Sequence, residues 1–383
     1  MACYRPMKGF IYGKTTNGKD NYIITDYQIN HIEINGKGSI IRCYDQDGHR
    51  ANEVIRAFRE IPCGKCIGCR MSQAKQFTDR IFLELQNHKD NCFVTLTYDD
   101  DNLPLNIRVD KESGVIVDDE GVATLRKEHI SEFIKALRNK LNYKGTEVIT
   151  RGKNKGKKRP VYFKEGDPEF KKILFYASGE YGDRTRRPHA HLIIFGWSPL
   201  ASDPDLKYVG KNDLDQSYYF SPFIDNIWKK GNNIVSDVSY ETGAYVARYV
   251  QKKAYQKDNL FFEKNNIEPE FTLMSRRPAI GKTWFDTHKK CYATFSYQDF
   301  ATEKGNKRIG KIRYFDKLME KVDDDISDKD FFNYHKIKEE RRYFQENQKE
   351  IKLRNTSLPY LEALKVEETA LENRIKVLKR DKI

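Results

Sequence analysis

The sequence predicts an α+β fold in which an antiparallel sheet is flanked by helices and followed by a helical C-terminal extension. Two short apolar runs, 172–178 and 191–196, are joined by a polar turn and read as a hairpin. A third run, 93–98, is rich in β-branched and aromatic residues, and amphipathic helical patterns separate these runs. We therefore expect strands 93–98 and 189–196 to be central neighbours in the sheet.

The first half of the chain supplies elements in a clear order. Residues 1–70 mix Gly, Asn and Asp with short apolar alternations, which predicts small strands and loops. Residues 72–88 carry apolar side chains at helical spacing and lead into the strand 93–98. Residues 126–141 place apolar side chains on one face and basic side chains on the other, which predicts a helix that covers a sheet.

The second half adds a basic loop and further helices. Residues 151–159 hold six Lys and Arg and no apolar residue, so we expect an exposed mobile excursion that is either a solvated loop or a phosphate contact. Residues 239–254 have helical spacing. Pro359 predicts the start of a last helix, whose leucine stripe could dock on the body of the protein or pair with another chain.

Composition and charge limit the class of protein. The chain has 383 residues, of which 38% are hydrophobic and 13% aromatic, enough to bury a core and to exclude general disorder. The net charge of +13 favours a polyanionic partner such as nucleic acid. No apolar stretch approaches the ~18–20 residues that cross a bilayer, and no signal-peptide block is present. We therefore expect a soluble, intracellular protein without a membrane partner.

Composition also predicts three segments along the chain. Residues 1–90 form a cysteine-containing N-terminal segment with its leading helix. Residues 91–290 carry the strands and motifs of the main domain. Residues 291–383 form a charged helical C-terminal extension.

A His-x-His pair opens the apolar strand at 191–196. Because side chains alternate along a strand, His189 and His191 project to one face and could hold a single divalent cation. In the hairpin, Glu180 lies at the end of the partner strand and faces them, which would complete a two-histidine, one-carboxylate site suited to Mg²⁺ or Mn²⁺. The alternative for Glu180 is a solvent-exposed strand terminus.

Two tyrosines, Tyr245 and Tyr249, lie one helical turn apart on the predicted helix 239–254 and share a face. A phenol with a pKa of about 10 is mostly protonated at neutral pH, so it attacks a phosphodiester only where the developing charge is stabilised. Lys253, one turn further on, could neutralise a phosphate, although Lys252 could serve instead or both could cap the helix. The alternative is that both tyrosines pack as core residues.

A cysteine cluster precedes the first helix. Cys63, Cys66 and Cys69 have the close spacing of thiolate ligands, and an odd total of seven cysteines in a long chain argues against a disulfide scaffold. Cys3 could complete a tetrahedral zinc site if the N-terminus folds back, and Cys43 is the alternative fourth ligand. Buried free thiols remain the other interpretation.

Together these motifs resemble the HUH endonucleases, and most closely the rolling-circle replication initiation proteins of microviruses, in particular the gokushovirus branch. The resemblance is carried by residues 93–98 as the first motif, 179–182 with 187–191 as the second, 244–253 as the third, and 62–70 upstream. It implies that 91–290 is an HUH catalytic domain with the histidine strand at the centre of its sheet.

The resemblance also implies a function. His189 and His191, with Glu180 as third ligand, would bind the metal, and Tyr245, Tyr249 or both would be nucleophiles. Such a protein nicks one strand at a replication origin, keeps the 5′ end as phosphotyrosine, releases a 3′-OH and later rejoins the strand. Its partners would be single-stranded and origin DNA and host replication proteins, in the cytoplasm of the host bacterium.

Two other functions remain open from the sequence. A non-catalytic, zinc-containing protein that binds single-stranded nucleic acid would explain the charge, the aromatic residues and the cysteine cluster, but not the histidine and tyrosine motifs. A conjugative relaxase uses similar chemistry. It is disfavoured because relaxases usually have three histidines in the central motif and tyrosines near the start of the chain, whereas here the tyrosines follow the histidines.

Overall fold

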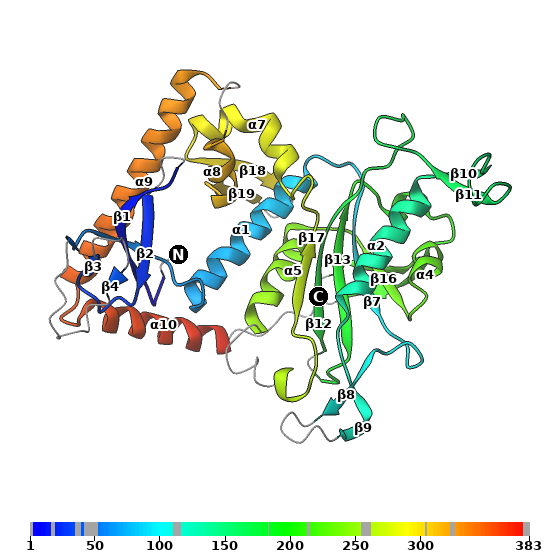
Figure 1. Cartoon of the computed structure of the whole chain (residues 1–383), viewed down its shortest axis with the longest axis horizontal. Helices are drawn as coiled ribbons and strands as arrows, with labels where there is room; N and C mark the ends of the chain where they lie inside the picture. The colour runs from blue at the N-terminus through cyan, green and yellow to red at the C-terminus, as the bar shows by residue number, and fades with distance from the viewer. Residues whose placement is uncertain are drawn as a thin grey trace. The chain divides into compact units, whose positions relative to one another are not determined.

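A seven-stranded antiparallel sheet is the largest element of the computed structural model (Figure 1). Its strand order is β14-β15-β16-β7-β13-β12-β17. The bounds are β7 (Asn91–Thr97), β12 (Leu174–Tyr181), β13 (Pro188–Phe195), β14 (Lys207–Lys211), β15 (Ser217–Phe220), β16 (Asn233–Ser236) and β17 (Phe271–Met274). The α+β class with an antiparallel sheet is therefore confirmed, and β7 and β13 pair as predicted.

The structure describes residues 3–377 except for 17–19, 35–39, 42–52, 110–115, 183, 213–214, 254–261, 303–304 and 322–325. Within this part of the chain, no helix combines the length and the apolar character that a membrane span requires.

The register of β13 against its two neighbours sets which side chains meet. In the pairing with β12, Glu180 is opposite His189 and Ser178 is opposite His191. In the pairing with β7, Thr95 is opposite His191. Because side chains alternate along each strand, all five of these residues project from the same face of the sheet.

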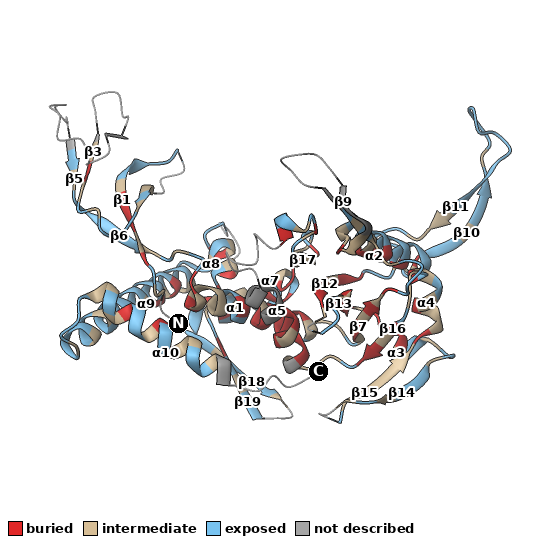
Figure 2. Ribbon diagram, turned by 90° about the horizontal axis from the view of Figure 1, so that it is seen from below, coloured by how far each residue is buried: buried red, intermediate tan, exposed pale blue. Residues whose placement is uncertain are grey.

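Helices cover both faces of the sheet. Helices α2 (Lys127–Leu141) and α4 (Pro222–Trp228) pack on the face that carries Val94, Leu96 and Leu192. The opposite face, which carries the histidines, is covered by α5 (Tyr240–Lys253) and by the second half of α1 (Ile67–Leu85). Figure 2 shows buried residues concentrated in β7, β12, β13 and α5. The predicted helices 126–141 and 239–254 are thus confirmed.

The basic residues 151–159 do not form the loose excursion predicted from their composition. They lie in a regular hairpin between β10 (Tyr143–Val148) and β11 (Lys158–Tyr162). The backbone N–H of Ile149 donates to the carbonyl of Lys157 at 2.9 Å, and the N–H of Gly156 donates to the carbonyl of Ile149 at 2.8 Å. Gly156 has a φ of 87°, which a side chain would disfavour. A second hairpin joins β8 (Leu105–Val109) and β9 (Ile116–Ala123).

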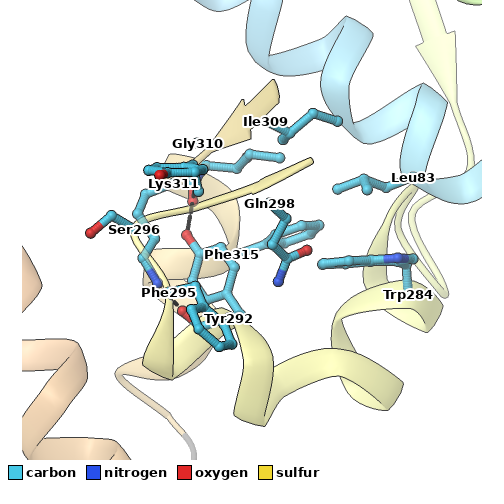
Figure 3. Close-up of a pocket in the computed structure, with 12 residues that line it drawn as sticks. Leu83, Trp284, Tyr292, Phe295, Ser296, Gln298, Ile309, Gly310, Lys311 and Phe315 are labelled. Atoms are coloured by element: carbon cyan, nitrogen blue, oxygen red, sulfur yellow. Dashed lines mark hydrogen bonds between the residues drawn. The ribbon is translucent and has the colours of Figure 1, made fainter. Parts of the chain in front are cut away.

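A separate apolar cluster lies around α7 (Lys282–Thr294) and the short hairpin of β18 (Tyr297–Thr302) and β19 (Gly305–Gly310). Trp284, Phe285 and Phe315 pack there against α1, with Phe315 supplied by α8 (Arg313–Met319). Figure 3 shows the pocket that these rings line. Its volume of about 10 Å³ holds at most one water molecule, so it offers no ligand site.

The N-terminal strands and the C-terminal helices form one compact unit, residues 1–73 with 342–380, and residues 74–341 form the other. The first unit contains the sheet β2-β1-β6 and the sheet β4-β3-β5, as the predicted small strands required. The bounds are β1 (Met7–Lys14), β2 (Asp20–Thr25), β3 (Ile32–Ile34), β4 (Ile40–Ile41), β5 (Glu53–Ile55), β6 (Phe58–Ile61), α9 (Asp328–Arg354) and α10 (Tyr360–Val377).

Helix α10 docks on these N-terminal strands, which decides between the two alternatives for the leucine stripe. Glu60 accepts hydrogen bonds from the hydroxyls of Tyr27 at 2.5 Å and Tyr360 at 3.2 Å. Arg5 forms an ion pair with Glu368 at 2.9 Å. The segments 1–90, 91–290 and 291–383 follow the chain in order whereas the two units interleave it, and that three-part division stays a prediction.

The packing of α2 makes a first prediction. Leu137 is fully buried under the sheet, so Leu137→Ala should lower the free energy of unfolding by about 2–5 kcal/mol. The exposed Lys135→Ala on the same helix should change it by less than about 0.5 kcal/mol. Urea denaturation followed by tryptophan fluorescence measures both values. Equal effects of the two substitutions would contradict the described packing of α2.

Candidate active site

Glu180, His189 and His191 form a cluster of potential metal ligands on the face of the sheet below α5. One ligand atom from each lies within 4.8 Å of the others. The Oε2 atom of Glu180 is 4.0 Å from Nε2 of His189 and 3.8 Å from Nε2 of His191. Glu180 is fully buried, so it is not the exposed strand terminus that was its alternative, whereas the His189 side chain stays 18% exposed. The cluster is therefore open on the histidine side.

The spacing of these three ligand atoms suits one cation. An octahedral ion with ligands at about 2.1 Å holds neighbouring ligand atoms about 3.0 Å apart. The observed 3.8 and 4.0 Å separations require only small side-chain rotations to reach that value. Two imidazoles and one carboxylate suit Mg²⁺, Mn²⁺ or another divalent ion. The residues present thus fit a divalent cation without selecting one.

Hydrogen bonds at the far side of each ring orient the ligand atoms. Nδ1 of His189 lies 3.2 Å from the carbonyl oxygen of Arg187, which can only accept, so this nitrogen carries the proton and Nε2 presents its lone pair. Nδ1 of His191 lies 2.9 Å from Oγ1 of Thr95. The hydroxyl of Ser178 donates to Oε1 of Glu180 at 2.5 Å, which leaves Oε2 directed at the histidines.

The electrostatic environment keeps His191 neutral. Burial lowers its pKa well below the ordinary value of 6.5, and the neighbouring His189 lowers it further. The ring of Phe93 stacks on His191 with 5.4 Å between centroids and 21° between planes. A neutral imidazole retains the lone pair that binds a metal, so this environment suits a ligand.

Tyr245 lies beside the histidines. Its ring centroid is 5.5 Å from that of His191, with the rings edge to face, and His189 is 4.9 Å from His191 on the other side. Tyr245 is only partly buried and also packs against the apolar cluster of α5 and the sheet. Packing and a place in the site are therefore compatible at this position.

The other residues of the predicted catalytic set are described only in part. The backbone of Tyr249, Lys252 and Lys253 belongs to α5, one and two turns beyond Tyr245. Their side chains lie outside the described residues. Their roles stay predictions.

The cysteine cluster comes together as predicted, with Cys3 as its fourth member. One sulfur each from Cys3, Cys63, Cys66 and Cys69 lies within 4.8 Å of the others. The Sγ atom of Cys3 is 3.6 Å from that of Cys63 and 3.8 Å from that of Cys66, so these thiols are not joined by disulfides. Cys43, the alternative fourth ligand, lies outside the described residues.

Backbone N–H groups point at these sulfur atoms. At Cys66, burial raises the thiol pKa, but hydrogen bonds from the N–H groups of Cys69 and Tyr4, together with neighbouring thiols, outweigh it and give a pKa of about 7. The N–H of Cys66 donates in turn to Sγ of Cys63 at 3.2 Å. Such donors stabilise a thiolate, which is the form that binds a metal.

Three residues of the site were not predicted from the sequence: Phe93, Thr95 and Ser178. The run 93–98 shows the alternation that puts Phe93 and Thr95 on one face. What it lacks is the register, which comes from hydrogen bonds between strands that are almost 100 residues apart. With the pairing of Thr95 to His191 known, the same alternation would have identified both residues.

Comparison with known proteins points to DNA replication. Residues 91–254 match a family model described as replication-associated protein ORF2, a segment that contains the histidine strand and the tyrosine helix. The predicted resemblance is confirmed. No solved structure matches the chain.

Three replication-associated proteins are similar over longer stretches. The chain is 33% identical over 235 residues to replication-associated protein VP4 of Bdellovibrio phage phiMH2K, which covers 61% of the chain and 60% of that relative's length. It is 29% identical over 342 residues to replication-associated protein ORF2 of Spiroplasma virus 4, covering 89% and 86%. It is 29% identical over 302 residues to replication-associated protein ORF4 of Chlamydia phage 1, covering 77% and 62%.

The contact of Thr95 with His191 makes a second prediction. Thr95→Val removes the hydroxyl that orients the His191 ring, and Mn²⁺ affinity should fall about 10- to 100-fold. Thr95→Ser keeps the hydroxyl and should retain an affinity close to the original. Isothermal titration calorimetry with Mn²⁺ compares the three proteins. A valine variant that binds Mn²⁺ as tightly as the serine variant would show that this hydrogen bond does not orient the ligand.

Proposed function

We propose that the protein is a replication initiator that nicks one DNA strand at an origin, holds the 5′ end as phosphotyrosine and rejoins the strand after rolling-circle replication. The observation that carries this proposal is the position of the Tyr245 ring, 5.5 Å from His191 in the cluster of Glu180, His189 and His191. The similarity to replication-associated proteins of small phages supports the same class of function.

The proposed reaction exchanges one phosphodiester for another. The phenolic oxygen of Tyr245 attacks the scissile phosphorus and loses its proton to solvent. A bond forms between this oxygen and phosphorus, and the bond from phosphorus to the 3′ oxygen breaks. The 3′ oxygen takes up a proton and leaves as a free 3′-OH. Because one ester bond replaces another of similar energy, no external energy source is needed, and the reverse reaction rejoins the strand.

The residues of the cluster prepare this step. Glu180, His189 and His191 would hold the divalent cation, Mg²⁺ or Mn²⁺. When bound, the cation draws negative charge from the non-bridging phosphate oxygens and fixes the phosphate in position. Thr95 and the Arg187 carbonyl hold the two rings in fixed orientations before DNA arrives, so little reorganisation is needed during the reaction.

The neighbouring residues of α5 would extend the activity. Tyr249 lies one turn beyond Tyr245, so a second phenol would be available to cut the regenerated junction while the first linkage is resolved. Lys253, or Lys252 in its place, would neutralise charge on the phosphate. Single-stranded and origin DNA would be the substrates, and host replication proteins in the cytoplasm of the host bacterium would extend the released 3′ end.

The cysteine cluster leads us to propose a structural zinc ion as well. A tetrahedral zinc with Zn–S bonds of about 2.3 Å holds its sulfur atoms about 3.8 Å apart. The separations of Cys3 from Cys63 and from Cys66, 3.6 and 3.8 Å, agree with that value. Such an ion would fix the N-terminus to the start of α1. The same cluster is the observation that favours the alternative function, a zinc-containing protein that binds single-stranded nucleic acid without cutting it.

Substitution of the tyrosines distinguishes the two functions. With Mn²⁺ and supercoiled DNA that carries the origin, the protein should produce nicked circles with covalently attached protein. The double variant Tyr245→Phe with Tyr249→Phe should lose about 10³-fold or more of this activity, because no nucleophile remains. Tyr208→Phe on the exposed strand β14 is the control and should retain full activity.

Denaturing gels that separate free from DNA-linked protein measure the adduct. An adduct formed by the double variant at the original rate would rule out tyrosine transesterification at these positions. Binding without any strand breakage by the unsubstituted protein would favour the non-catalytic alternative.

The zinc proposal has its own measurement. Elemental analysis of the purified protein should find one zinc ion per chain, and Cys63→Ser or Cys69→Ser should reduce the content several-fold because a ligand is lost. Cys291→Ser changes an exposed cysteine outside the cluster and should leave the zinc content unchanged. If the protein reconstituted with Zn²⁺ retains none after dialysis, the cluster is a group of free thiols.

A further inference from the structure

The β10–β11 ribbon, residues 143–162, carries most of its charge on one sign. It holds seven Lys and Arg against a single acidic residue, Glu147. Every residue from 150 to 160 is exposed. Figures 1 and 2 both show the ribbon projecting away from the large sheet. It is thus a basic surface on an extended support.

The positive charge of the ribbon is not balanced by neighbouring carboxylates. Glu147 forms an ion pair with Arg159 at 2.6 Å. Among the described residues, no carboxylate forms an ion pair with the other exposed cations of the turn and of β11, which are Arg151, Lys153, Lys155, Lys157 and Lys158. A concentration of exposed like charges raises the free energy of the folded protein and is relieved by a polyanion.

The composition of the ribbon indicates the kind of polyanion. From residue 149 to 159 there is no aromatic side chain, and a protein surface that binds single strands normally stacks bases on aromatic rings. The cations suit phosphate groups, whose spacing is densest along duplex DNA. A two-stranded ribbon also has the width that the major groove of B-DNA admits. These features favour duplex DNA over a single strand.

The support of the ribbon is firm and fixes its distance from the histidines. Asn142, just before β10, accepts a hydrogen bond from the N–H of Lys171 at 2.8 Å and donates to the Lys171 carbonyl at 3.0 Å. Lys171 leads into β12, and Glu180 lies six residues beyond the first residue of that strand, Leu174. At about 3.3 Å per residue, the base of the ribbon and the metal cluster are about 20 Å apart along the strand.

We propose that the β10–β11 ribbon is a duplex-binding arm that contacts DNA phosphates along the major groove, about six base pairs from the phosphate that is cut. This inference rests on the proposed function for the position of the cut, but not for the binding itself. The arm holds the duplex that flanks the nick site, while the cluster of Glu180, His189 and His191 acts on the single strand. It contacts phosphates and so adds affinity without reading sequence.

The test uses a variant of the arm in the full-length protein, with Lys153, Lys155, Lys157 and Lys158 all changed to Gln. Binding to a duplex of about 30 base pairs should weaken about 10- to 100-fold at physiological salt. The slope of log K against log salt should fall by about 2 to 4, since each lost phosphate contact contributes about 0.9. Cleavage of a short single-stranded oligonucleotide with Mn²⁺ should stay within about twofold of the original rate.

The control removes the same charge elsewhere, with Lys290, Lys317, Lys321 and Lys336 all changed to Gln. These lysines are also exposed and lie in the same unit of the chain. The control should bind the duplex with nearly the original salt slope. Equal loss in both variants would mean that only net charge matters and would overturn the proposal. An equal loss of single-strand and duplex binding in the arm variant would also overturn it.

The two proposals can fail separately. If no covalent adduct forms but the arm variant alone loses duplex affinity, the nicking function is wrong and the arm stands. If adducts form and the arm variant binds duplex as the original protein does, the arm is wrong and the nicking function stands.

Discussion

Backbone hydrogen bonds between β13 and its two neighbours hold Glu180 opposite His189, and Thr95 opposite His191. Because side chains alternate along a strand, a slip of one residue in either ladder would turn the ligands or their supporting hydroxyl into the apolar core below α2. The buried Leu192 and Ile194, which occupy that core, oppose such a slip. The arrangement of the candidate site therefore depends on the same burial that stabilises the sheet.

The sheet register also explains how a fully buried carboxylate can be kept at the end of β12. Burial of a charged group costs free energy unless hydrogen bonds and opposite charge offset that cost. Ser178 supplies a hydrogen bond to Glu180 from the same strand. The two imidazoles beside it add lone pairs rather than positive charge, since burial lowers the pKa of His191. This environment favours a cation between the three side chains, and Tyr245 on α5 lies at the edge where a phosphate would meet it.

Local patterns in the sequence predicted much of this arrangement. The His-x-His alternation, the hairpin that brings Glu180 to the histidines, the helix of Tyr245 and the return of Cys3 to the cysteine cluster could all be read from spacing. Contacts between distant segments could not. Thr95 depends on the register of two strands far apart in sequence, and the docking of α10 on Glu60 joins residues 300 positions apart. The composition of 151–159 also indicated an irregular loop, because hydrogen bonds of the β10–β11 ribbon leave no periodic apolar signal.

The central claim is that His189, His191 and Glu180 share one divalent cation beside Tyr245. Anomalous scattering from crystals of the protein grown with Mn²⁺ tests this claim most directly. The account predicts a manganese peak within about 2.3 Å of Nε2 of both histidines and of a Glu180 carboxylate oxygen. A peak at another site, or none at these residues when Mn²⁺ is saturating, would contradict it.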